Sequence, residues 1–390
     1  MMKKSLNTLL ILLCAAVLAL GVSCSTFVQV RDHVPAAVNM SSMKKIAVTS
    51  TNVVNNYSNY SPNPYIRIQN AHIGAPDSQI QLYTAWQGSL PATLGIHTQS
   101  SLCQKLSETD YFTVAEPTVA DALYTSGVIL GSTKDQFIQA GIDAVLSSRL
   151  TVLTYDEYIF SKEFYHTDQA TGNKVADGIN YYLKTTMAIL LEYNVIGVEQ
   201  SKLVISKNYN RKIEKETLVA TYKYAAGSEP ARFTYKAYTA PSLLDDCRSA
   251  INDMLTGIVN DLAPRWVYSY EELLPNSAKV KEIDRGYELA QSANYSMAYD
   301  VFYDAWLRYG DVNSGYNAAI LLYARGWLED AVVLMQEVYT RTGSQRAYEK
   351  AQELKYKLQQ AQIADAQVSG TTTGVNSSLN ENEVWNIYVL

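Results

Sequence analysis

The sequence predicts an α+β or α/β protein, with an N-terminal mixed-sheet sandwich domain with packed helices followed by an all-α helical-repeat domain. Its 390 residues are enough to build two separate hydrophobic cores. Apolar residues make up 47% of the chain and charged residues 18%, a composition typical of globular proteins. Near Pro275 the pattern changes from strand-like alternation to continuous helical periodicity. We therefore expect the two domains to cover residues 44–274 and 275–366.

Residues 1–23 have the pattern of a secretory signal peptide. Lys3 and Lys4 precede an uncharged apolar run, Leu9–Leu20, which is too short to cross a bilayer as a helix. Small residues and then Cys24 follow, which predicts that Cys24 carries lipid such as palmitate after cleavage. The lipobox is relaxed, so cleavage without lipid attachment is the alternative. With the lipid, residues 24–43 are expected to form a lipidated tether.

The residues after Cys24 predict where the anchor lies. Ser25, and not an aspartate, follows the cysteine, and residues 25–30 contain no acidic run. We therefore expect an outer-membrane lipoprotein that faces the periplasm, with display on the cell surface as the less favoured alternative. Loss of Lys3 and Lys4 with the signal changes the net charge from −6 to −8, which argues against nucleic acid as a partner.

The N-terminal domain is expected to alternate strands and helices. Dense β-branched content predicts strands, and apolar stripes at helical spacing predict helices. The predicted strands are residues 44–54, 111–114, 144–155, 181–195 and 203–209, and the predicted helices are residues 91–107, 135–140 and 242–262. The last helix has the clearest apolar stripe, with Ser242 as its expected N-cap, and should lie on the sheet.

A segment rich in tyrosine and asparagine, residues 55–86, interrupts this domain. Long loops are often functional, and tyrosine rings stack on sugars and peptides. The segment therefore suggests glycan binding as an alternative function, although an ordinary packed insertion explains it as well. The candidate glycan-binding residues are Tyr57, Tyr60, Tyr65 and Tyr83.

The C-terminal domain contains two segments that align at an offset of 33 residues. Ala298 and Phe302 in the first correspond to Ala331 and Met335 in the second. This spacing is within one residue of the tetratricopeptide period, and a generic helical bundle is the alternative. Tyrosines are favoured in protein interfaces, so those of this region are candidate partner-binding residues. They are Tyr287, Tyr295, Tyr299, Tyr303, Tyr316 and Tyr323, and residues 367–390 are expected to be a flexible tail.

Catalytic and metal-binding patterns are scarce in the sequence. No histidine is spaced for metal binding with a second ligand, and no G-x-S-x-G motif is present. We therefore expect no enzyme activity, no cofactor and no metal. Cys103 and Cys247 both fall on apolar helix faces, so they are either buried free thiols or a disulfide.

Two segments carry a resemblance to known lipoproteins. Lys44–Val48 and Gly141–Leu146 look like strands of the α/β domain of curli-secretion and penicillin-binding-protein-activator lipoproteins. The whole layout resembles a Bacteroidetes lipoprotein family of unknown function with this α/β domain and C-terminal tetratricopeptide-like repeats. The resemblance implies no catalytic residues. The expected function is that of a membrane-anchored scaffold or assembly factor that binds a protein partner in the cell envelope.

Overall fold

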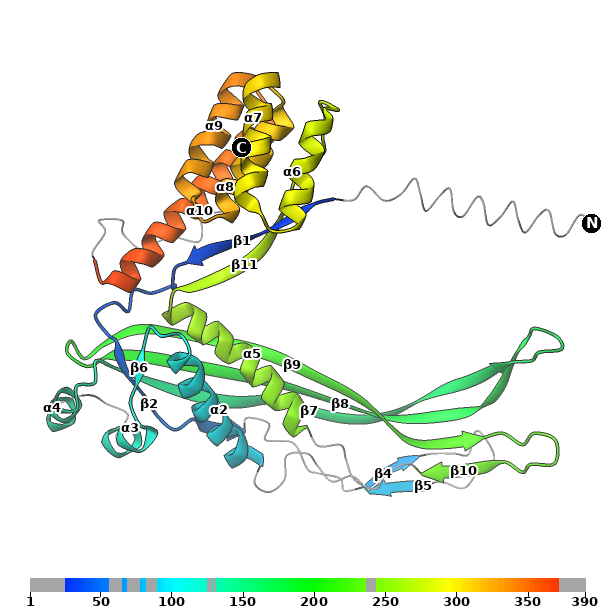
Figure 1. Cartoon of the computed structure of the whole chain (residues 1–390). Coiled ribbons are helices and arrows are strands. Elements are labelled where there is room, and N and C mark those ends of the chain that lie inside the picture. The colour runs from blue at the N-terminus through cyan, green and yellow to red at the C-terminus, as the bar shows by residue number, and fades with distance from the viewer. Residues whose placement is uncertain are drawn as a thin grey trace, which may run out of the picture. The chain divides into compact units, whose positions relative to one another are not determined.

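The computed structural model describes residues 25–55, 65–68, 78–81, 90–124, 129, 131–235 and 243–371, which form a mixed α/β protein. The chain divides into two compact units (Figure 1). The sheet unit is Ala36–Ala263, and it is inserted into the helical unit, which combines Met1–Pro35 with Pro264–Leu390. The predicted domain boundary at residue 274 therefore lies about ten residues beyond the observed one at Ala263. The difference arises because the strand over residues 265–272 belongs to the helical unit.

The sheet unit is built on a seven-stranded mixed sheet with the order β10-β9-β8-β7-β2-β6, in which β3 also pairs with β7. Its strands are β2 (Lys45–Val48), β3 (Asn52–Asn55), β6 (Thr113–Val114), β7 (Ala144–Thr167), β8 (Lys174–Gly197), β9 (Lys202–Lys223) and β10 (Arg232–Tyr235). β2 runs parallel to β6 and β7, and β3 runs parallel to β7, whereas β7 to β10 are antiparallel. A separate two-stranded sheet pairs β4 (Tyr65–Ile68) with β5 (Ser78–Gln81).

The three central antiparallel strands are much longer than the sequence predicts. β7 and β8 have 24 residues each and β9 has 22, and they form the long curved sheet of Figure 1. The segment 156–167, which lies beyond the predicted strand over residues 144–155, continues β7 because its tyrosines, Ile159 and Phe160 favour extended backbone. Register shifts at Val152/Thr154 and Phe164/Tyr165 let these long strands bend.

Helices cover both faces of the parallel end of the sheet. Ile46 and Val48 point into the core shared with α2 (Leu90–Ser107) and α5 (Leu244–Leu262), as the alternation along a strand requires. Ala47, between them, points to the opposite face, which α3 (Pro117–Leu123) and α4 (Ser132–Gln139) cover. The predicted mixed sheet is thus covered here by helices and not by a second sheet.

The α5 helix lies on the sheet as predicted, and a buried carboxylate fastens it there. Asp261 accepts hydrogen bonds from the hydroxyls of Tyr193 and Tyr209 at 2.7 and 2.5 Å, and Lys207 Nζ lies 2.9 Å from its other oxygen. Burial and Asp261 raise the pKa of Tyr193 well above its usual range. The helix begins at Leu244 with Leu243 as N-cap and no side-chain cap, while the expected cap, Ser242, lies outside the described residues.

The helical unit begins with a two-stranded antiparallel ribbon, in which β1 (Phe27–Val34) pairs with β11 (Arg265–Glu272). The predicted tether over residues 24–43 is therefore wrong for β1. Val28 and Val30 are buried in the core of the helices that follow β11, so this short segment is held by hydrophobic contacts.

Five helices complete the unit: α6 (Lys281–Gln291), α7 (Tyr295–Tyr309), α8 (Val312–Ala324), α9 (Leu328–Thr342) and α10 (Gln345–Ser369). Both ends of α7 and α9 are 33 residues apart, as are the starts of α8 and α10, which agrees with the offset seen in the sequence alignment. Gly310 and Gly343 both end a helix in the left-handed conformation, and Asp311 and Ser344 cap the helices that follow them. The α10 helix continues to Ser369, into the segment expected to be a flexible tail.

The close crossing of α7, α8 and α9 depends on Gly315. A Cβ atom at this position would lie 2.7 Å from Val338 Cγ2 and 2.9 Å from Trp306 Cδ2. We expect Gly315→Val to lower the free energy of unfolding by about 1–3 kcal/mol, because the two neighbouring side chains are buried and must shift. Thermal unfolding followed by circular dichroism measures this. Val333→Ala, at an exposed site on α9, is the control, and an equal loss of stability in both variants would contradict the prediction.

Candidate functional site

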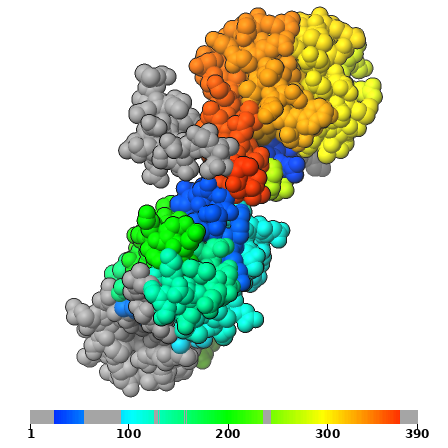
Figure 2. Space-filling model, turned by 90° about the vertical axis from the view of Figure 1, so that its left-hand side faces the viewer, coloured from blue at the N-terminus to red at the C-terminus, as the bar shows by residue number. Residues whose placement is uncertain are grey.

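The helical unit contains a cavity of about 470 Å³, a volume within the range of ligand sites. Its walls come from the ribbon, from the α8–α9 turn with the start of α9, and from the C-terminal half of α10. Figure 2 shows α10 (red) beside β1 (blue) in this unit, and the two elements are in contact. The lining residues are Arg31, His33, Trp266, Gly326, Trp327, Leu328, Glu329, Asp330, Leu358, Ala361 and Asp365.

Two tryptophans dominate the cavity wall. Trp266, from β11, is 51% exposed, and Trp327, the N-cap of α9, is 49% exposed. Each carries a guanidinium on its ring, with Arg31 4.9 Å from the Trp266 centroid and Arg325 3.7 Å from the Trp327 centroid. A cation–π contact at an exposed site contributes about 0.5–1 kcal/mol and so favours the indole orientation seen here. The cavity therefore offers two oriented, half-exposed aromatic surfaces.

His33 stacks on the ring of Trp266. The two rings stack at 4.4 Å with an interplanar angle of 11°, and the imidazole is buried. His33 Nδ1 lies 2.7 Å from Asp365 Oδ1. Through this contact, the C-terminal half of α10 positions the His33 imidazole, on which the Trp266 indole stacks. A strand residue near the start of the fold and a residue of the last helix thereby form one wall of the cavity.

The rim of the cavity is acidic and exposed to solvent. Glu329 and Asp330 occupy the first turn of α9, where the helix dipole stabilises negative charge, and Asp365 is exposed on α10. Against these three carboxylates, the lining contains Arg31 and the paired His33. The combination of indole faces and an acidic rim suits an amphipathic or cationic group.

The described lining residues include no serine, threonine, cysteine or lysine. Among these residues, the His33–Asp365 pair therefore has no hydroxyl, thiol or lysine amine beside it. Within the described ranges, no group of three or more histidine, cysteine or acidic side chains could hold a metal ion.

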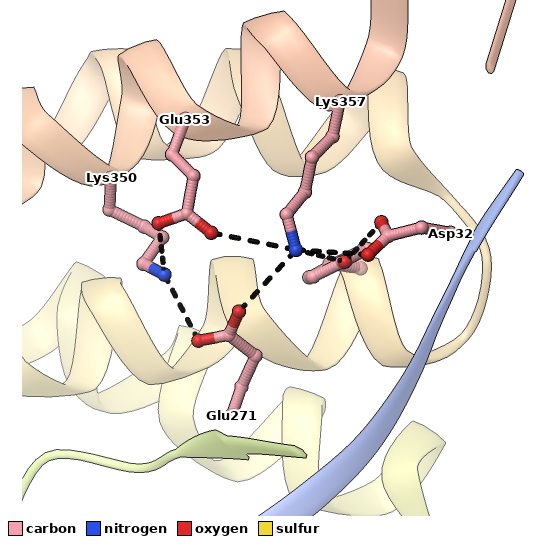
Figure 3. Close-up of polar contacts among 6 residues, drawn as sticks. Asp32, Glu271, Lys350, Glu353 and Lys357 are labelled. Carbon is pink, nitrogen blue, oxygen red and sulfur yellow. Dashed lines mark hydrogen bonds and ion pairs between the residues drawn. The ribbon is translucent and has the colours of Figure 1, made fainter. Parts of the chain in front are cut away.

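A network of charged residues and one tyrosine fastens α10 to the ribbon. It consists of Asp32, Glu271, Tyr323, Lys350, Glu353 and Lys357, and we call it the Lys357 network (Figure 3). Lys357 Nζ lies 3.1 Å from Asp32 Oδ2 and 3.8 Å from Glu271 Oε1, and it donates to Tyr323 Oη at 2.7 Å. The Tyr323 hydroxyl also donates to Asp32.

The second lysine of the network, Lys350, lies 3.0 Å from Glu271 and 2.5 Å from Glu353. Burial lowers the pKa of Lys350, but the hydrogen bond that its ammonium donates to Glu353 and the charge of Glu271 outweigh this and raise the pKa above its usual value. Lys350 is therefore protonated at neutral pH and does not serve as a nucleophilic amine. Three of the six side chains, those of Asp32, Glu271 and Tyr323, come from positions that no spacing in the sequence links to the others, and sequence reasoning missed the network.

The six tyrosines predicted to meet a partner lie mainly inside the helical unit. Tyr316 and Tyr323 are buried, so the prediction is wrong for these two. Tyr287 packs edge-to-face on Phe302 and donates a hydrogen bond to the Leu274 carbonyl at 2.5 Å. Burial raises the pKa of Tyr287 to about 12, which agrees with a packing role.

Tyr295, Tyr299 and Tyr303 are half-buried, and their interface role stays a prediction. Tyr295 Oη accepts a hydrogen bond from the backbone nitrogen of Gln29 at 3.2 Å, and the rings of Tyr299 and Tyr303 stack at 5.3 Å. None of the six tyrosines lines the cavity as described. The signal that could have identified the site was Trp327 at the turn between two paired helices.

The remaining predicted site residues fall mostly outside the described residues. Cys24, Tyr57, Tyr60 and Tyr83 lie outside them entirely. Tyr65 begins β4, but the placement of its side chain also lies outside the description. Lipid attachment and glycan binding at these residues stay predictions.

Cys103 and Cys247 are free thiols within the core between α2, α5 and the sheet. Burial raises the pKa of Cys103 to about 11 and that of Cys247 to about 12. The thiolate is the reactive form, and at pH 8 a pKa of 11 leaves about one thousandth of Cys103 ionised. We expect a thiol reagent such as DTNB to leave both cysteines unmodified in the folded chain at pH 8 and to modify both after denaturation. Rapid reaction of either one before unfolding would refute the prediction.

No protein-family model matches the chain, and no curated protein is significantly similar to it. Among solved structures, the chain is similar to a neuraminyllactose-binding hemagglutinin homolog from Helicobacter pylori, with 8% identity, 60% of this chain and 89% of that chain covered, and a TM-score of 0.26. It is also similar to the lipoprotein GNA1162 from Neisseria meningitidis, with 12% identity, 55% and 99% coverage, and a TM-score of 0.23. The PelC dodecamer from Paraburkholderia phytofirmans matches with 12% identity, 61% and 98% coverage, and a TM-score of 0.20.

Proposed function

We propose that this chain is a non-enzymatic lipoprotein, anchored in the outer membrane through Cys24 and facing the periplasm, which binds a protein partner through the cavity of its helical unit. The observation that carries the proposal is the pair of half-exposed indoles, Trp266 and Trp327, each held by an arginine. Tryptophan and arginine are the residues that most often dominate the binding energy of protein interfaces.

The acidic rim supports a partner segment that carries a basic residue next to an apolar one. Glu329, Asp330 and Asp365 would attract the positive charge, and the indole faces would take the apolar side chain. A charge of −8 on the mature chain also favours basic partners over acidic ones. We further propose that α6–α10 are tetratricopeptide-like, a reading that the repetition of helix boundaries after 33 residues supports.

The anchor part of the proposal rests on the sequence around Cys24. In the described part of the chain, no helix is both long enough and apolar enough to cross a membrane. Metabolic labelling with an alkyne-bearing palmitate tests the anchor, with label expected on the native chain and absent from Cys24→Ala. Protease treatment of intact cells tests the orientation, since cleavage of the mature chain on intact cells would overturn the periplasmic placement.

The partner-binding part requires point substitutions and not removal of the helices. Deletion of the chain after Pro275 would uncover Val28 and Val30, which pack in the same core as the helices. Chemical cross-linking in cells with mass spectrometry is therefore best compared between the native chain and cavity variants that keep this core. Partners that cross-link equally to the native chain and to a Trp266→Ala/Trp327→Ala variant would count against the proposed site.

A further inference from the structure

The side of the β1–β11 ribbon that faces away from the buried Val28 and Val30 is aromatic. Phe27 is 54% exposed, Tyr268 is 61% exposed and Tyr270 is 69% exposed. The strand register places all three on one side, because Gln29 pairs with Tyr270 and Arg31 pairs with Tyr268. We call these three aromatic residues the ribbon face.

The ribbon face is unusual for a surface in contact with water. A two-stranded ribbon with one buried side normally carries polar residues on the other. Here Gln29 and Arg31 are the polar neighbours, the carboxylate of Glu272 lies directly across from Phe27, and Trp266 of the cavity continues the row of exposed aromatic side chains on the same side. Contiguous exposed aromatic residues mark a surface that meets a partner or a membrane.

The fold begins immediately after the predicted lipid-bearing residue. Thr26 is buried, its carbonyl accepts a hydrogen bond from the Leu273 nitrogen at 2.8 Å, and its hydroxyl accepts one from Gln291 at 3.0 Å. Only Ser25 therefore stands between Cys24 and a fixed residue. Three Cα–Cα steps separate Cys24 from Phe27, so these residues lie within about 11 Å of each other. The headgroup layer of one leaflet is about 5–8 Å thick.

We propose that the ribbon face lies in the headgroup layer of the bilayer that holds the Cys24 lipid, with Phe27, Tyr268 and Tyr270 inserted among the headgroups. This inference rests on the proposed lipid anchor. Tyrosine rings favour this layer, because their apolar part is removed from water while the hydroxyl stays hydrated, and the Phe27 ring contributes apolar area alone. With the lipid as the main anchor, the ribbon face adds a second membrane contact that fixes the orientation of the helical unit.

The test uses the full mature chain with Cys24→Ser, which cannot be lipidated, and vesicles of zwitterionic phosphatidylcholine. We expect measurable binding in a flotation assay, and a decrease of about tenfold or more in the partition coefficient for Phe27→Ser/Tyr268→Ser/Tyr270→Ser. Because the contact is apolar, binding should change little between low and high salt. Tyr270→Ser alone, at the most exposed site, provides a milder variant if the triple variant unfolds.

The matched control is Tyr309→Ser, which removes a tyrosine that is 53% exposed at the end of α7 and should leave vesicle binding unchanged. Absence of vesicle binding, an equal loss in the control, or a triple variant that abolishes self-association without affecting vesicles would overturn the proposal. The palmitate labelling of Cys24 is measured separately. If the native chain takes up no palmitate label but the unlipidated chain still binds vesicles through the ribbon face, the proposed lipid anchor is rejected. The proposed membrane contact of the ribbon face is then retained.

Discussion

Replacing Asp32 with alanine is expected to lower the free energy of unfolding of the helical unit by about 2 kcal/mol. The substitution leaves the Lys357 ammonium and the buried Tyr323 hydroxyl without the carboxylate that both contact. The lysine keeps only the more distant acids Glu271 and Glu353, at 3.8 and 3.5 Å. Denaturant unfolding followed by tryptophan fluorescence measures the effect, since Trp266, Trp306 and Trp327 all lie in this unit.

A double-mutant cycle separates the lost interaction from the cost of an unpaired charge. Asp32→Ala combined with Lys357→Met removes both partners and should recover part of the stability lost in Asp32→Ala. The matched control is Asp304→Ala, which breaks the exposed i,i+4 pair with Arg308 at 2.9 Å and should cost less than about 0.5 kcal/mol. If Asp32→Ala costs no more than Asp304→Ala, the Lys357 network does not fasten α10 to the ribbon.

Replacing Trp327 with alanine is expected to reduce recovery of the cross-linked partner by about tenfold or more. The indole supplies half of the aromatic surface of the cavity, and its loss also frees Arg325, which packs on it at 3.7 Å. Because Trp327 is half-exposed, the variant should keep most of its stability, so the loss would report binding and not unfolding. Trp266→Ala should act in the same direction, since it removes the other indole and the ring on which His33 stacks.

Quantitative cross-linking in cells, normalised to the amount of each variant, measures the recovery. Tyr309→Ala is the control, because Tyr309 is an exposed aromatic residue of the same unit that does not line the cavity. Partner recovery that falls equally in Tyr309→Ala and Trp327→Ala would show that the indole has no special role.

The periodic parts of the fold could be predicted from the sequence. The stripe of Ile251, Met254, Leu255 and Ile258 predicts α5 and its place on the sheet, and the 33-residue offset matches the spacing of α7 and α9. These features depend on residues a few positions apart, so a local pattern records them. Strand lengths were underestimated, because β7 continues through charged residues whose side chains point to solvent.

The site could not be predicted in the same way, because its parts are far apart in the sequence. The short segment Phe27–Val34 looks like a tether, and only its pairing with β11, more than two hundred residues later, makes it a strand. The tyrosines were assigned to an interface by composition, but a helix core also uses their large rings, as Tyr316 and Tyr323 show. His33 and Asp365 are 332 positions apart, and no local pattern links them.

Site-specific photo-cross-linking from position 361 tests the central claim most directly. Ala361 is a small residue of α10 that lines the cavity, so a photoreactive amino acid there reports what occupies it. The proposed function predicts a discrete protein adduct in cells that disappears when Trp327→Ala is added and that is absent when the probe stands at the exposed position Val333. An adduct of equal yield from both positions, or one that persists in Trp327→Ala, would contradict a partner-binding site in this cavity.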